Sequence, residues 1–138
     1  MDISVVDSSS YFKGLLLLIR KDSRITEPEH VIMLRIGKAL GFEKTFTEEA
    51  INEILSNRYI SNEPPVFSSR EFAEKFIKDG LVLAASDKEI HPREEEWLLA
   101  VAGANKVESS WYFNEKNSLL QMKYHTIHLD AEDLDVRY

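Results

Sequence analysis

The sequence predicts an all-α protein, a compact bundle of about six helices with an internal duplication of two helix–loop–helix units. Apolar residues recur at spacings of three and four along most of the chain, as in helices that bury one face. The pattern D-x-x-I-x-x-x-E occurs at 22–29 and again 65 positions later at 87–94. Two copies are too few for a solenoid, so we expect the units to pack face to face. The same offset relates the flanking pairs Leu18/Leu83, Ile36/Val101 and Ala39/Ala104.

The composition is that of an ordinary globular protein with one domain, 1–138, whose core covers 8–117 and whose less regular tail is 118–138. Hydrophobic residues make up 43% and charged residues 30% of the chain. The absence of cysteine excludes disulfides and thiolate chemistry. The net charge of −7 argues against nucleic-acid binding, which normally uses a basic face. It is compatible with binding cations or a basic protein partner.

The chain carries no sign of a membrane segment or a leader. Its longest apolar runs, 15–19 and 97–102, are far shorter than the roughly 20 residues of a membrane-spanning helix. The N-terminal stretch contains Asp2 and Asp7 and lacks the basic region of a signal peptide. We therefore expect a cytoplasmic protein that is not inserted in a membrane.

Two helices are expected in the first unit. A serine within 8–10 caps the first helix, which buries an apolar stripe and ends near Lys21. Thr26 and Glu29 form a capping box for the second helix. Gly41 stands where glycine commonly follows a helix C-terminus, so this helix ends near position 40.

A shorter third helix is expected to begin at Thr45 or Thr47 and to connect the two units. The adjacent prolines Pro64 and Pro65 exclude a helix in the segment that follows, 61–67. This segment is too short to separate two domains.

The fourth helix is expected to run to about position 86 from a capping box made by Ser68 and Glu71. Gly80 interrupts it, as Gly14 interrupts the first helix. A glycine inside a helix costs about 1 kcal/mol relative to alanine. Either a close helix crossing compensates for both glycines or their similar placement is accidental.

Pro92 predicts the first turn of a fifth helix, and a short sixth helix is expected around 109–116. Trp111, Tyr112 and Phe113 cannot all face inward on so short a helix. The tail loses helical periodicity and ends in a run of acids, so we expect irregular structure packed on the bundle.

The motif acids carry the strongest functional signal. Glu29 and Glu94 fall at the third helical position, where capping and the helix dipole explain a carboxylate. Asp22 and Asp87 follow a helix C-terminus, where a negative charge is unfavourable by roughly 0.3–1 kcal/mol. Either each aspartate shapes its loop as an Asx-turn, or the four carboxylates hold a divalent cation. Neither loop has the spacing of an EF-hand.

The paired motifs, the helix order and the small-residue segment LLAVAGANKV resemble the TerB-like family, the tellurite-resistance-associated all-helical domain. The resemblance covers roughly 11–112. It implies a compact helical bundle with an acidic metal site at Asp22 and Glu29 and at Asp87 and Glu94. It also implies a stress-response, tellurite-resistance or phage-defence role beside membrane-linked or calcium-binding partners.

The chain departs from the family pattern directly after each motif aspartate. The family usually has glycine there, whereas this chain has Ser23 and Lys88. Glycine relieves a left-handed turn, so both loops should differ in shape from the family's. The Lys88 ammonium stands beside Asp87 and would substitute for a cation, which puts the second half of the site in doubt.

Other chemistry finds little support in the sequence. His125 and His128 are the only close histidine pair, and in a strand their spacing puts them on opposite faces, so zinc binding there is disfavoured. Phosphate-binding glycine loops, G-x-S-x-G and H-E-x-x-H are absent, so we expect no enzyme.

Two functional hypotheses follow. The first is a non-catalytic TerB-like adaptor that binds a divalent cation, Ca²⁺ or Mg²⁺ rather than Zn²⁺, and a protein partner. The second is a protein–protein interaction domain without a metal, in which the acidic loops are purely structural.

Overall fold

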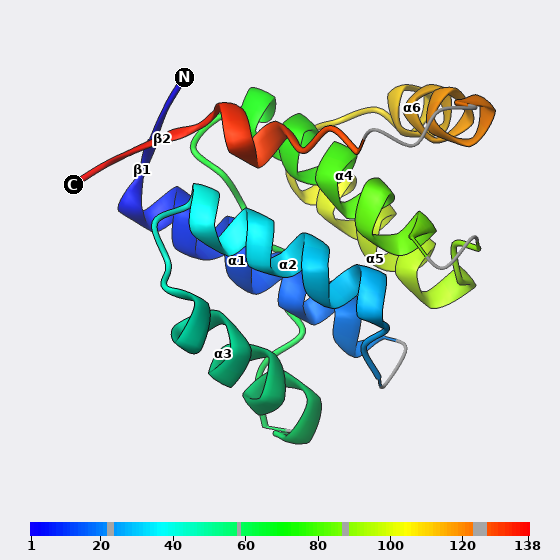
Figure 1. The fold of residues 1–138 in the computed structure, drawn as a ribbon. Helices are drawn as coiled ribbons and strands as arrows, with labels where there is room; N and C mark the ends of the chain where they lie inside the picture. The colour runs from blue at the N-terminus through cyan, green and yellow to red at the C-terminus, as the bar shows by residue number, and fades with distance from the viewer. Residues whose placement is uncertain (22–23, 58, 87–88, 123–126) are drawn as a thin grey trace.

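The computed structural model describes residues 1–21, 24–57, 59–86, 89–122 and 127–138. Within these ranges the chain forms six α-helices, two short strands and one 3-10 helix, which confirms the predicted all-α bundle (Figure 1). Among the described residues, no helix is both long and apolar enough to cross a membrane. In chain order the elements are β1 (Asp2–Ser4), α1 (Val5–Arg20), α2 (Glu27–Ala39), α3 (Lys44–Ser56), α4 (Arg70–Ala85), α5 (Pro92–Ala104), α6 (Ser109–Gln121), η1 (Asp130–Asp133) and β2 (Asp135–Arg137).

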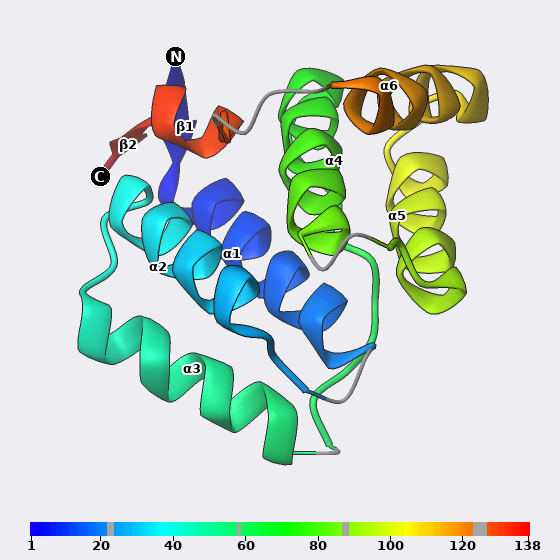
Figure 2. The ribbon, with the colours of Figure 1, turned by 45° about the vertical axis from the view of Figure 1, so that its right-hand side comes forward.

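The helices form two groups of three that are consecutive in the chain. Helix α3 packs on α1 and α2, and α6 packs on α4 and α5, while α1 packs against α4 between the groups (Figure 2). Each helix of the second group begins and ends 65 positions after its counterpart in the first. The sequence alone predicts α3 as a mere connection, whereas its bounds and packing match those of α6. The duplication is still a hypothesis, but the repeated unit it now proposes has three helices instead of two.

The last turns of α2 and α5 share one backbone geometry. Gly41 (φ 88°) and Lys106 (φ 60°) both adopt the left-handed conformation that closes a helix. In each case the N–H of the following residue, Phe42 or Val107, donates over 2.8 Å to the carbonyl five positions before it, Gly37 or Ala102. The glycine predicted to end α2 is confirmed. Its counterpart is a lysine, which carries a steric penalty in this conformation.

Gly14 and Gly80 lie where helices approach each other closely. A Cβ atom at Gly14 would lie 2.7 Å from the ring of Phe76 on α4. A Cβ atom at Gly80 would lie 2.6 Å from Leu98 on α5. Both separations are shorter than ordinary van der Waals contact. Close packing, rather than accident, therefore accounts for the two glycines.

Two helix starts differ from their prediction. Ser4, not a serine within 8–10, caps α1 by accepting the N–H of Asp7 at 3.1 Å. Ser69, not Ser68, caps α4. Ser68 instead donates its N–H (3.0 Å) and its hydroxyl to the carboxylate of Asp7. This link between distant residues decides which serine is free to cap, and it is invisible in local sequence.

The start of α3 also differs from its prediction. The helix begins after Glu43, and neither Thr45 nor Thr47 is its cap. Thr47 is fully buried inside the helix, next to Gly37 of α2. In the described part of the chain its hydroxyl has no hydrogen-bond partner. A threonine that reads as a helix cap thus serves as a small core residue.

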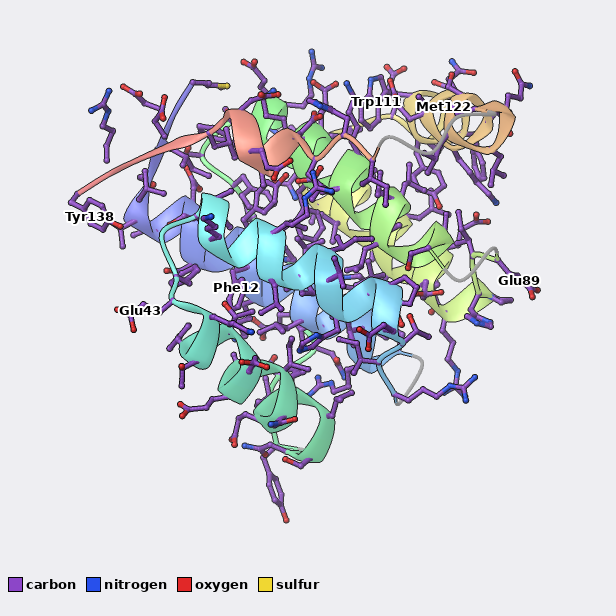
Figure 3. The ribbon with its side chains drawn as sticks, viewed as in Figure 1. Phe12, Glu43, Glu89, Trp111, Met122 and Tyr138 are labelled. Atoms are coloured by element: carbon purple, nitrogen blue, oxygen red, sulfur yellow. The ribbon has the colours of Figure 1, made fainter. Side chains whose placement is uncertain are left out.

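The described part of the tail packs on the helices. Strand β2 pairs in parallel with β1, with Ile3 opposite Val136. The 3-10 helix η1 contacts α2 and α4, and from η1 the chain runs on to Tyr138 (Figure 3). The prediction of a packed tail is correct, although the short strand was not expected. Three tail residues join the core: Leu129, Ala131 and Leu134.

Candidate functional site

The motif glutamates Glu29 and Glu94 are buried at the starts of their helices, each 2% exposed. Oε1 of Glu29 accepts the N–H of Thr26 at 2.9 Å, and Oε1 of Glu94 accepts the N–H of His91 at 3.0 Å. These bonds satisfy backbone donors that the first helical turn leaves unpaired. The predicted capping role is confirmed in both copies of the motif.

The motif isoleucines, Ile25 and Ile90, are partly buried against the core. Two of the three motif positions therefore have a structural role in each copy. Asp22 and Asp87 lie outside the described residues, so the predicted Ca²⁺ or Mg²⁺ site at these carboxylates stays a prediction. The C-terminal ends of α1 and α4, which precede the two aspartates, lie at the same end of the bundle, away from the strands (Figure 1).

A different set of metal-ligand atoms converges in the C-terminal segment. Nε2 of His128 lies 3.2 Å from Oδ1 of Asp130 and 3.3 Å from Oδ2 of Asp133. One ligand atom from each of the three residues lies within 4.8 Å of the other two. Among the described residues this is the group able to hold a metal. We call it the His128 cluster. The pairing of His128 with His125 is untested, since His125 lies outside the described residues.

The His128 cluster has one fixed member and two exposed ones. The side chain of Asp130 is 12% exposed, whereas those of His128 and Asp133 are 67% and 59% exposed. Asp130 opens η1, and the backbone of η1 is fastened to α4. Oδ1 of Asp79 accepts the N–H of Asp130 at 2.6 Å, and Oδ2 accepts the N–H of Ala131 at 2.8 Å.

Asp79 is itself a buried carboxyl group, 1% exposed, in the middle of the bundle. The hydroxyl of Tyr11 on α1 donates to its Oδ2 at 2.6 Å. Burial raises the pKa of Asp79 to about 7, although the hydrogen bonds from Tyr11 and from the η1 backbone act in the opposite direction. Burial and the neighbouring Asp79 also raise the pKa of Tyr11 well above its ordinary value. Asp79 thus joins α1, α4 and the tail in one polar network.

A second attachment joins the same turn to α2. Arg35 forms an ion pair with Glu132, with Nη2 2.5 Å from Oε1 and Nε 3.2 Å from Oε2. The guanidinium also donates to the carbonyl of Ile127 at 3.2 Å. Through these contacts Arg35 binds the residues that directly precede His128 and Asp133 in the chain. The segment whose side chains supply the three ligand atoms is therefore bonded to both α2 and α4.

The geometry of the His128 cluster suits a small divalent ion. Imidazole nitrogen and carboxylate oxygen bind Zn²⁺ at about 2.0–2.2 Å, so neighbouring tetrahedral ligand atoms are roughly 3.3–3.5 Å apart. The two separations from His128 fall close to that range. Three ligands leave a fourth position for water or another group. A proton on His128 would satisfy the same two carboxylates, so proton and metal compete for one place.

Sequence reasoning missed this cluster because the tail was not expected to form a turn there. The signal was present as H-x-D-x-x-D at 128–133, but a histidine and acids at such spacing converge only if the chain bends. Comparison with protein-family models, curated proteins and solved structures gives no match, so no comparison bears on the resemblance to the TerB-like family.

Proposed function

We propose that the protein is a non-catalytic binding protein, of the TerB-like kind suggested by its motifs, that takes up a divalent transition-metal ion at the His128 cluster. The observation that carries this proposal is the approach of one nitrogen and two carboxylate oxygens to a common point, at 3.2 and 3.3 Å from His128. The two carboxylates repel each other, and either a proton on Nε2 of His128 or a metal ion between the three atoms offsets that repulsion. A metal ion bound there would take the place of that proton.

The donor set favours Zn²⁺ over Ca²⁺ or Mg²⁺ at this position. Imidazole suits zinc and other transition metals, whereas hard cations prefer sites made only of oxygen. The motif acids Asp22, Glu29, Asp87 and Glu94 form such an all-oxygen set, and they remain the proposed position for Ca²⁺ or Mg²⁺. The two proposed sites share no residue and prefer different ions, so one set of titrations separates them.

Metal binding would act on the docking of the tail. The ligands lie on a segment held to α4 through Asp79 and to α2 through Arg35. An ion at the His128 cluster would join the exposed His128 and Asp133 to the fixed Asp130. We propose that the ion thereby stabilises the tail on the helices and the surface it forms for a protein partner.

Thermal unfolding of chelator-treated protein tests this proposal. With free Zn²⁺ at 100 times its dissociation constant, the stability should rise by about 2.7 kcal/mol, which corresponds to several degrees in midpoint. The variants His128→Gln and Asp133→Asn should lose this response. His30→Gln is the matched control, because His30 is a half-buried histidine on α2 outside the cluster. Co²⁺ in place of Zn²⁺ adds an absorption spectrum that reports tetrahedral ligation.

The outcomes separate the hypotheses. A Zn²⁺ response that persists in His128→Gln, or that His30→Gln also abolishes, contradicts the His128 cluster as the site. A response to Ca²⁺ or Mg²⁺ that disappears in Asp22→Asn/Asp87→Asn places a separate ion at the motif loops. No response to any ion favours the second hypothesis, a protein–protein interaction domain without a metal.

A further inference from the structure

A cleft of about 570 Å³ lies where α1 ends and α5 begins, apart from the His128 cluster. Its polar lining comes from three segments that are distant in sequence. Arg20 and Lys21 end α1, Asn62 belongs to the connection before α4, and Arg93 and Glu96 belong to the first turns of α5. Counting only residues that the structure describes, three cations and one carboxylate surround this cleft in a protein whose net charge is −7.

The positions of the α1 cations are fixed by hydrogen bonds. The Arg20 guanidinium donates to the carbonyls of Asn57 (3.2 Å) and Ile60 (2.9 Å) and to Oδ1 of Asn62 (2.5 Å). Nζ of Lys21 donates to the same Oδ1 at 3.0 Å. All of these acceptors are uncharged, so they hold the two cations in place without neutralising them.

Lys21 lies over an aromatic surface that is also fixed. Its Nζ is 4.7 Å from the centre of the Trp97 ring, within the range of a cation–π interaction. The indole N–H of Trp97 donates to the carbonyl of Gly14 at 3.2 Å, and Trp97 is only 5% exposed. An ammonium group has three N–H donors, and among the described residues one donor of Lys21 is paired, with Oδ1 of Asn62.

The cleft has an excess of positive charge. The pKa of Lys21 is lowered mainly by burial and further by the positive charges of Arg20 and Arg93, while Glu96 acts in the opposite direction. Arg93 is in the first turn of α5, where the helix dipole disfavours a cation. Within the described ranges, the Arg93 side chain forms neither a hydrogen bond nor an ion pair. A bound anion would relieve this repulsion.

We infer that the cleft at the junction of α1 and α5 binds a phosphate monoester group through Lys21 and Arg93, with Arg20 adding charge. A phosphate monoester carries nearly two negative charges at neutral pH and three acceptor oxygens. Among the described lining residues, the three cations and Glu96 sum to a complementary charge of +2. Arginine offers a planar fork for phosphate, and lysine offers a point charge.

The remaining features of the cleft match an organic phosphate. Its volume lies within the range of small-molecule sites, roughly 300–1,000 Å³, and exceeds what the phosphate group alone would fill. The Glu96 carboxylate can accept a hydrogen bond from a hydroxyl or amino group of the same ligand. This inference does not rest on the proposed metal site at the His128 cluster, since the cleft and that cluster share no residue.

Titration calorimetry with inorganic phosphate and O-phosphoserine, supported by amide chemical shifts, tests the inference. The variants Lys21→Gln and Arg93→Gln should each weaken binding about ten- to hundredfold, as expected for loss of a charge-assisted hydrogen bond. Lys13→Gln is the control, because Lys13 is an exposed lysine on α1 outside the cleft. Arg93 is exposed, so its replacement leaves the fold intact if Lys21→Gln disturbs it.

Glu96→Gln distinguishes a binding site from a merely structural charge cluster. Removal of this carboxylate, the one among the described lining residues, should tighten the binding of inorganic phosphate severalfold, and a damaged fold cannot produce that gain. Wild-type protein that binds neither probe saturably at millimolar concentration overturns the inference. So does a loss in Lys13→Gln as large as that in Lys21→Gln.

Two further probes identify the source of the phosphate. A phosphoserine peptide that binds more tightly than O-phosphoserine, with its unphosphorylated form inactive, supports a phosphorylated protein partner. A sugar phosphate that binds more tightly than the peptide supports a small metabolite. Either result supports the phosphate site, whereas equal binding of the phosphorylated and unphosphorylated peptides overturns it.

Discussion

Replacing Tyr11 by phenylalanine removes one buried hydroxyl and tests how the tail is fastened to the bundle. Tyr11 is fully buried, and its hydroxyl donates to Oδ2 of Asp79 at 2.6 Å. Phenylalanine preserves the ring, so the loss is that of a hydrogen bond to a carboxyl group. Such a bond contributes about 1.5–3 kcal/mol when the acceptor is charged and about 0.5–1.5 kcal/mol when it is neutral.

The penalty should therefore grow with pH. Burial raises the pKa of Asp79 to about 7, against about 3.9 for an unfolded aspartate. Between these values the folded state binds the proton that the unfolded state has lost, so this group's contribution to stability falls as pH rises from about 4 to 7. Because the Tyr11 hydrogen bond lowers the pKa of Asp79, Tyr11→Phe raises that pKa further and extends the fall in stability to higher pH.

Urea unfolding of both proteins at pH 4, 6 and 8, followed by circular dichroism, measures this difference. We expect Tyr11→Phe to lose roughly 1 kcal/mol at pH 4 and roughly 2–3 kcal/mol at pH 8. Tyr59→Phe serves as the control, since Tyr59 is 98% exposed and its replacement should be neutral. A penalty that is constant with pH, or larger at pH 4, would refute the reasoning about Asp79.

Two further predictions concern the backbone and the helix crossings. Lys106→Gly should stabilise the protein by about 0.5–1 kcal/mol, because glycine relieves the left-handed conformation at φ 60°. At the equivalent position of the first unit, Gly41→Ala adds a side chain and should destabilise the protein by about 1 kcal/mol. If both substitutions changed the stability in the same direction, the assigned left-handed conformations would be contradicted. Gly80→Ala should destabilise by about 1–3 kcal/mol, because its Cβ would meet Leu98 at 2.6 Å. Gly103→Ala in α5 meets nothing within 4 Å and should instead stabilise by up to about 1 kcal/mol, so a loss in urea midpoint for both variants would exclude packing as the cause.

The helices and their repeat were predictable because their signals are local. The capping box of Thr26 and Glu29 and the proline that opens α5 need only one turn of chain to act. Gly41 likewise ends α2 through its own backbone freedom. The 65-residue offset, visible in short motifs, then extends to the bounds of all six helices in the described chain.

Some local signals were misleading because a distant partner changed their role. Ser68 resembles a helix cap in sequence, but the carboxylate of Asp7 engages it and leaves the capping to Ser69. Thr47 resembles a cap as well, but packing against Gly37 places it in the core. Hydrogen bonding and burial are decided by which segments meet, and that is absent from a short stretch of sequence.

The candidate metal centre was decided by tertiary structure alone. His128, Asp130 and Asp133 are close in sequence, but their ligand atoms converge because η1 turns the chain there. That turn is held by the buried carboxyl group of Asp79, more than 50 positions away in the sequence. The apolar periodicity of the helix that carries Asp79 gives no indication of this contact. The sequence by itself therefore determines which stretches are helical and at what offset they recur, and it places those helix ends whose signals act within one turn. Only the tertiary structure determines which charged groups meet, because bringing distant segments together requires the packed core.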